Sequence, residues 1–120
     1  MSKLLLVSSD LVLSSRIQGA TANCGLALTT AADHAAAVAA CDDDCRVVLL
    51  DLRTAGLDVA ALVEGLRQHS AKLSIVACGP HVHAQRLKEA RAAGCDMVVT
   101  RGQLDQEAES ILRRILDMGT

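Results

Sequence analysis

The sequence predicts an α/β protein in which five parallel strands form one doubly wound sheet and helices cover both of its faces. Three observations support this prediction. Apolar runs alternate with segments of helical periodicity along the whole chain. The 120 residues suit a single domain, which we expect to span residues 1–120, and 51 % of them are hydrophobic. Right-handed crossovers then favour the strand order 2-1-3-4-5.

Ten elements follow from this alternation, and no linker or low-complexity segment separates them. The predicted strands lie at residues 4–7, 26–29, 46–51, 73–78 and 95–100. The predicted helices lie at about residues 11–23, 30–40, 58–69, 82–93 and 104–118.

The first five elements have recognisable ends. The first strand is a run of four aliphatic residues, and the first helix places Leu13 and Ile17 on one face before Gly25 at its C-cap. Thr30, with Asp33 three residues later, predicts the N-terminal cap of an alanine-rich second helix. The third strand is apolar on both faces, as expected for a central strand of a parallel sheet.

The remaining elements show similar signals. Asp58 is a suitable cap for the third helix, whose Leu62 and Leu66 point inward. Pro80 lacks a backbone donor and therefore ends the fourth strand or opens the next helix. Gly94 follows the fourth helix at its C-cap, and the last helix has the clearest amphipathic pattern.

In a sheet of this order, a functional site lies beyond the carboxyl ends of the strands, near the reversal between strands 1 and 3. The residues predicted at this edge are Ser8, Ser9, Asp10, Asp51, Leu52, Arg53, Cys78, Gly79, Thr100 and Arg101. The site therefore combines two carboxylates with two guanidinium groups.

Composition excludes several classes of function. The chain has no Phe, Tyr or Trp, which excludes base-stacking nucleic-acid modules and argues against aromatic-cage binders. A net charge of −2 is too balanced for direct binding of nucleic acid. No segment resembles a signal peptide or a membrane span, so we expect a cytoplasmic protein without a membrane partner. Its five cysteines are then expected to be reduced thiols.

The segment from Leu49 to Asp58, LLDLRTAGLD, resembles the phosphoacceptor strand and loop of response-regulator receiver domains. These domains have the CheY-like variant of the flavodoxin-like fold, and the resemblance extends over all five strand–helix units. It implies a regulatory protein of two-component signal transduction and not an enzyme. It also implies that Asp51 stands at the phosphoacceptor position, with a histidine kinase as a possible phosphodonor.

Other positions depart from that family's pattern. The acidic pair that holds Mg²⁺ is matched by Ser8 and Ser9, and the nearest carboxylate comes one step later, at Asp10. The Thr or Ser at the end of the fourth strand is matched by Gly79, or by Cys78 if the register shifts by one residue.

The last strand departs as well. Its Lys-Pro pair is matched by Arg101-Gly102, and the aromatic switch residue is matched by Val98. The proline of the loop after the phosphoacceptor is replaced by Ala55. The resemblance therefore suggests an atypical receiver, or pseudo-receiver, with a kept scaffold around a changed pocket.

These departures weaken the expected binding of Mg²⁺. Mg²⁺ prefers an octahedral set of oxygens with one or two carboxylates. Asp51, the Arg53 carbonyl and an inward-turned Asp10 are the ligands available, so we expect no resident cofactor and at most weak Mg²⁺ binding. We instead predict an Asp51–Arg101 contact, with the Ser8 and Ser9 hydroxyls capping the first helix.

Two other clusters of residues are alternative metal sites. Cys78 with His81 and His83 is one candidate for a transition metal. Cys41 and Cys45 flank three aspartates, but a C-x3-C spacing is not that of a usual zinc site, and a solvated acidic turn is the preferred interpretation.

The resemblance also implies an interaction surface. In the family, partners bind the face formed by the fourth helix, fifth strand and fifth helix, which Arg101, Arg113 and Arg114 would border here. We expect a protein partner or an effector domain there, with a homodimer as an alternative. Two other functions stay open: a conventional receiver phosphorylated at Asp51, and a small flavodoxin-like ligand-binding domain, although the loop after the first strand lacks a glycine to cradle phosphate.

Overall fold

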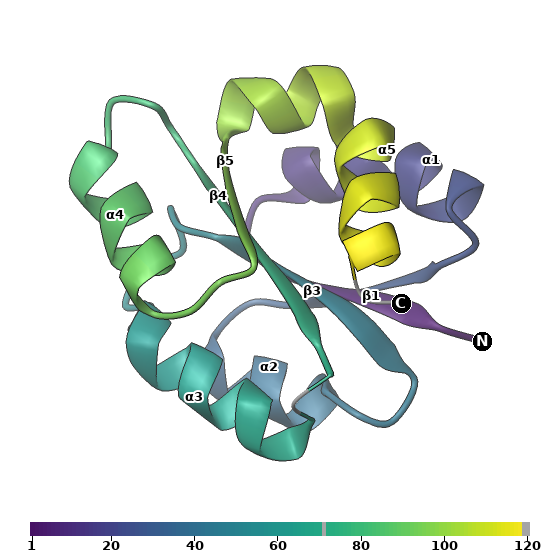
Figure 1. Cartoon of the computed structure of the whole chain (residues 1–120), viewed down its shortest axis with the longest axis horizontal. Helices are drawn as coiled ribbons and strands as arrows, with labels where there is room; N and C mark the ends of the chain where they lie inside the picture. Colours follow the sequence, from purple (N-terminus) through teal and green to yellow (C-terminus); the bar gives the residue numbers. More distant parts are fainter. Residues whose placement is uncertain (71, 119–120) are drawn as a thin grey trace.

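The computed structural model describes residues 1–70 and 72–118, and it contains the predicted sheet of five parallel strands in the order β2-β1-β3-β4-β5 (Figure 1). The strands are β1 (Lys3–Val7), β2 (Ala27–Ala31), β3 (Cys45–Asp51), β4 (Ser74–Gly79) and β5 (Met97–Thr100). The helices are α1 (Leu11–Asn23), α2 (His34–Ala40), α3 (Val59–His69), α4 (Ala84–Ala92) and α5 (Arg101–Met118).

The sheet separates two aliphatic cores. Alternate residues of each strand point to opposite faces, so Leu5 and Val7 contact the core beneath α2, α3 and α4, whereas Leu4 and Leu6 contact the core beneath α1 and α5. Figure 1 shows the two helical layers on either side of the strands. Within the described ranges, no helix is long and apolar enough to cross a membrane. A parallel sheet covered on both faces is the arrangement that its apolar strands require.

Three aspartates begin three of the helices. Asp10, Asp33 and Asp58 each accept hydrogen bonds from backbone N–H groups in the first turn of α1, α2 and α3. The predicted role of Thr30 was wrong, because β2 continues to Ala31 and Thr30 pairs with β1 as part of that strand. The strand therefore ends two residues later than predicted, and Asp33 caps α2.

The ends of the last four elements also differ from the prediction. A turn in which the His83 N–H donates to the Pro80 carbonyl delays the start of α4 to Ala84. β5 begins at Met97, because the preceding Asp96 binds the Ile75 N–H and the Arg67 guanidinium through its side chain.

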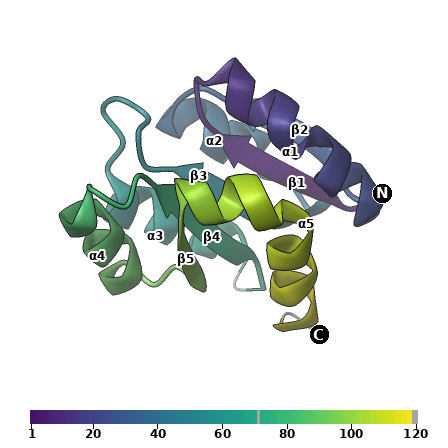
Figure 2. The same ribbon diagram turned by 90° about the horizontal axis from the view of Figure 1, so that it is seen from above.

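The last helix starts earlier than predicted and is bent. The Thr100 hydroxyl accepts from the Gln103 N–H, and the Gln103 side chain accepts from the Thr100 N–H, which is a capping box that starts α5 at Arg101. The backbone of Glu107 is non-helical, with φ −130° and ψ 28°. Figure 2 shows the resulting bend between the two parts of α5.

The caps give a direct test of the corrected helix start. We expect Asp33→Ala to lower the free energy of unfolding by about 1 kcal/mol, because the Ala36 N–H loses its acceptor. Thr30→Ala, at an exposed position of an edge strand, should change it by less than about 0.5 kcal/mol. Urea unfolding followed by circular dichroism measures both. A larger loss for Thr30→Ala than for Asp33→Ala would contradict this account of α2.

Candidate functional site

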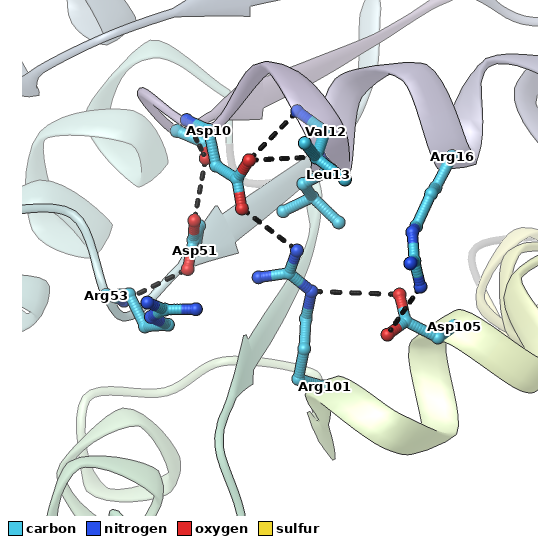
Figure 3. A network of polar contacts seen from close by, with 9 residues as sticks. Asp10, Val12, Leu13, Arg16, Asp51, Arg53, Arg101 and Asp105 are labelled. Atoms are coloured by element: carbon cyan, nitrogen blue, oxygen red, sulfur yellow. Dashed lines mark hydrogen bonds and ion pairs between the residues drawn. The ribbon is translucent and has the colours of Figure 1, made fainter.

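Asp51 is the buried centre of the candidate site. It ends β3 and is only 2 % exposed. The Ser8 hydroxyl donates to its Oδ2 over 2.6 Å. The Arg53 backbone N–H donates to its Oδ1 over 3.0 Å (Figure 3). A carboxylate withdrawn from water needs such donors, because an unsatisfied buried charge costs several kcal/mol. Asp51 is therefore held by its own neighbours at the ends of β1 and β3.

Asp10 lies at the same edge, at the start of α1. Its Oδ1 accepts from the backbone N–H groups of Val12 and Leu13 over 2.9 and 3.3 Å, and its Oδ2 accepts from Arg101 Nη2 over 3.0 Å. The Arg101 guanidinium, together with the two backbone donors, lowers the pKa of Asp10. Both of its oxygens are thus engaged by cationic or helix-end donors.

Arg101 is the cation of the site. Its side chain is 15 % exposed, and it lies between Asp10 and Asp105, whose Oδ1 is 3.7 Å from Nε (Figure 3). Burial opposes its charge, but the hydrogen bond to Asp10 and the fields of Asp51 and Asp105 outweigh this effect and raise its pKa. Asp105 also pairs with Arg16 at 3.2 Å, so the ion pairs link α1 to α5.

The predicted Asp51–Arg101 contact was wrong. Among the described residues, Arg101 makes its hydrogen bond to Asp10, and the hydrogen bonds to the Asp51 side chain come from Ser8 and Arg53. The reason is geometric, since the side chain of Asp10 at the helix start reaches the guanidinium. Nε and Nη1 of Arg101 are buried and have no hydrogen-bond partner in the described part of the chain.

The two serines have different roles. Ser8 is 7 % exposed and connects two parts of the site, because its hydroxyl donates to Asp51 and accepts from the Asp10 N–H over 3.0 Å. The prediction that Ser8 and Ser9 cap α1 was wrong for both serines, since Asp10 is the cap. Ser9 is exposed, and its hydroxyl makes no hydrogen bond to the described residues.

Gly79 stands at the end of β4, in register with Thr100, while Cys78 pairs with Asp51. The space beside Gly79 is filled: a Cβ atom there would lie 3.3 Å from Leu52 Cβ and Cδ1. A serine or threonine would therefore require Leu52 to move. This explains the glycine by packing, which the sequence pattern did not reveal.

The side chains of Cys78, Val98 and Arg53 make no hydrogen bond to the Asp51 carboxylate among the described residues. Burial, followed by the charge of Asp51, raises the pKa of Cys78 to about 12, so the thiol stays protonated and weakly reactive. Val98 is a partly buried residue of β5 packed against the core beneath α4. The Arg53 side chain is exposed, although its N–H binds Asp51.

The alternative metal sites do not assemble. Cys78 is fully buried, whereas His81 and His83 are exposed in the loop before α4. Cys41 and Cys45 are buried, and Asp42 between them pairs with Lys3 at 2.9 Å. In residues 1–70 and 72–118, no three His, Cys, Asp or Glu side chains are grouped so as to hold a metal ion.

The arrangement around Asp51 also fits Mg²⁺ poorly. The metal would need Asp51 and Asp10 to present free oxygens, but these already accept from Ser8, Arg53 and Arg101. Arg101 adds positive charge to the same site, and its Nε and Nη1 have no hydrogen-bond acceptor among the described residues, which suits an anion. The residues around Asp51 therefore favour the chain's own cation, Arg101, over a bound metal ion.

Comparison with known proteins places this geometry in a known fold. No family model matches the sequence, and no curated protein matches it. Among solved structures, the receiver domain of NtrX from Brucella abortus aligns with a TM-score of 0.82 and 23 % identity, covering 96 % of this chain and 98 % of that one. A CheY-like response-regulator receiver domain protein from Methanospirillum hungatei aligns with a TM-score of 0.83 and 13 % identity, covering 99 % and 96 %.

The chain therefore has the fold of response-regulator receiver domains, as the sequence predicted. It spans 28 % of a longer NtrX chain, to which it aligns with a TM-score of 0.84 and 23 % identity over 99 % of its own length. The comparison thus matches a receiver-sized unit of a larger protein.

The two serines allow a test of how Asp51 is held. We expect Ser8→Ala to lower the free energy of unfolding by about 1–3 kcal/mol, because Asp51 Oδ2 loses a buried donor. Ser9→Ala is the matched control, and it should be nearly neutral because Ser9 is exposed. Chemical unfolding of the three proteins measures the difference. Equal effects of both substitutions would contradict the role assigned to Ser8.

The Asp10–Arg101 pair predicts a pH dependence. The pKa of Asp10 lies below its ordinary value of 3.8, so its contribution to stability is present above that value and is lost as the pH falls through the folded pKa. Asp10→Asn should therefore flatten the acid side of the stability curve, measured by urea unfolding between about pH 6 and about pH 2. Asp58→Asn, at a helix cap held by the Ala61 N–H, is the control. The same flattening in both variants would contradict the arginine's role.

Proposed function

We propose that this chain is a receiver-type regulatory module that acts by binding a protein partner and does not use Mg²⁺-dependent phosphorylation of Asp51. The observation that carries the proposal is the Asp10–Arg101 ion pair at 3.0 Å beside the buried Asp51. Phosphoryl transfer depends on a cation that positions and neutralises the phosphoryl oxygens. In this chain the cation beside Asp51 is the Arg101 guanidinium, which is already paired with Asp10.

The changed residues around the site support a static module. Gly79 carries no hydroxyl, and Leu52 occupies the space that a serine or threonine side chain at this position would need. Val98 has no ring that could change its exposure. A chain with these residues keeps the receiver scaffold while lacking the groups that would report a modification of Asp51.

We assign the partner surface to α4, β5 and α5. Lys88 and Arg91 are exposed on α4 and Arg114 is exposed on α5, so these helices offer cations to a partner, whereas Arg113 pairs with Glu109 and donates to the Asn23 carbonyl of α1. The alignment to 28 % of a longer NtrX chain supports a receiver joined to an effector domain, and a separate protein or a second copy are the other occupants of this face.

A conventional receiver phosphorylated by a histidine kinase is the second candidate. One observation favours it: the buried Nη1 of Arg101 has no hydrogen-bond acceptor among the described residues and suits an arriving anion. Asp51 would be the acceptor in that case. The two candidates differ in whether Asp51 can be modified in the presence of Mg²⁺.

Intact mass measurement separates them. We expect no phosphoryl adduct after incubation with Mg²⁺ and acetyl phosphate, because the oxygens of Asp51 and Asp10 are engaged by donors. Asp51→Asn controls for adducts at other residues. A stoichiometric adduct in the parent protein that disappears in Asp51→Asn would overturn the proposal and establish the conventional receiver.

A further inference from the structure

Arg86 connects α4 to the loop that follows Asp51. This loop, residues 52–57, begins at Leu52 and ends at Leu57. Arg86 lies in the first turn of α4, and its Nη2 donates to the Leu52 carbonyl over 3.2 Å and to the Leu57 carbonyl over 3.4 Å. One guanidinium group therefore holds both ends of the loop.

Apolar packing reinforces this connection. Leu52 is 4 % exposed, and a Cβ atom on Gly79 would meet both Leu52 at 3.3 Å and Leu87 of α4 at 3.6 Å. Leu52 thus fills the space between the end of β4 and α4. The loop after Asp51 and the first turns of α4 are joined by polar contacts on Arg86 and by aliphatic contacts around Gly79.

The start of α4 lacks a side-chain cap. Its N-cap residue, His83, makes no side-chain cap hydrogen bond, and the buried residues of α4 are Leu87 and Ala90. A short helix with few buried side chains opens locally at a low free-energy cost. The hydrogen bonds of Arg86 are thus side-chain contacts that fix the first turn of α4 to the loop after Asp51.

We propose that Arg86 is a positioning residue that couples the Asp51 loop to α4, so that the loop and the first turn of this helix move as one unit. A change at Asp51 then reaches the α4 surface through the carbonyls of Leu52 and Leu57, without a hydroxyl at Gly79 or a ring at Val98. By thermodynamic reciprocity, a partner bound to α4 biases the loop by the same coupling. The inference does not depend on whether Asp51 is phosphorylated.

Amide hydrogen exchange measured by NMR tests the coupling. The reporters are the N–H groups of Leu57 in the loop, Leu87 in α4 and Val48 in β3, of which the first two donate to Thr54 and His83 carbonyls. We expect Arg86→Met to accelerate exchange about tenfold at Leu57 and Leu87, as the loss of hydrogen bonds from a charged donor implies, and to leave Val48 unchanged. Arg86→Lys should show a smaller effect, because an ammonium lacks the planar fork.

Two substitutions in the same helix serve as controls. Lys88→Met removes an exposed cation that makes no hydrogen bond or ion pair with the described residues, and it should change neither reporter. Glu89→Gln removes the carboxylate 3.8 Å from Arg86 Nη1 and should also leave both unchanged, if the carbonyl contacts and not this ion pair hold the loop.

A double-mutant comparison supplies the decisive result. Asp51→Asn should accelerate exchange at both Leu57 and Leu87 when Arg86 is present, and at Leu57 alone in Arg86→Met. An equal effect of Asp51→Asn on Leu87 in both backgrounds would overturn the coupling, as would equal acceleration of all three reporters by Arg86→Met. Neither result bears on acetyl phosphate labelling, so the two proposals fail separately.

Discussion

The burial of one carboxylate, Asp51, sets the arrangement of the whole strand-end edge. At 2 % exposure its charge has to be matched by donors from the chain, and Ser8 and the Arg53 N–H supply them. With Asp51 satisfied locally, Arg101 is left to pair with Asp10 at the start of α1. That pair, continued through Asp105 and Arg16, ties α1 to α5 on the face of the sheet that both helices cover.

The sequence was most informative about the strands and least informative about side-chain pairing. The apolar runs of β1, β3 and β4 allow no other placement, because they must be buried on both faces. The start of α5 was missed although Thr100 and Gln103 form a recognisable capping box, since the amphipathic pattern begins only at Leu104. Local hydrogen bonds decide helix ends within one or two residues, and hydrophobic periodicity does not report them.

The same limit applies to the candidate site. Strand order brings Ser8, Asp10, Asp51 and Arg101 to one edge, so the residues could be chosen from the sequence. Which carboxylate the arginine contacts depends on side-chain reach and on competing donors, and these follow only from coordinates. The packing of Leu52 against Gly79 is of the same kind, because a glycine in a sequence does not show which neighbour occupies its empty side-chain space.

The bend in α5 divides the contacts of this helix between two parts. The backbone of Glu107 leaves the helical conformation, so the helix consists of a first part that carries Arg101 and Asp105 and a second part that carries Ile111, Leu112 and Ile115 into the core. A helix changes direction where its backbone hydrogen-bond ladder is interrupted, so the two parts of α5 follow different axes. The break at Glu107 therefore separates the part of α5 that holds the ion pairs of Arg101 and Asp105 from the part that packs its last turns into the core.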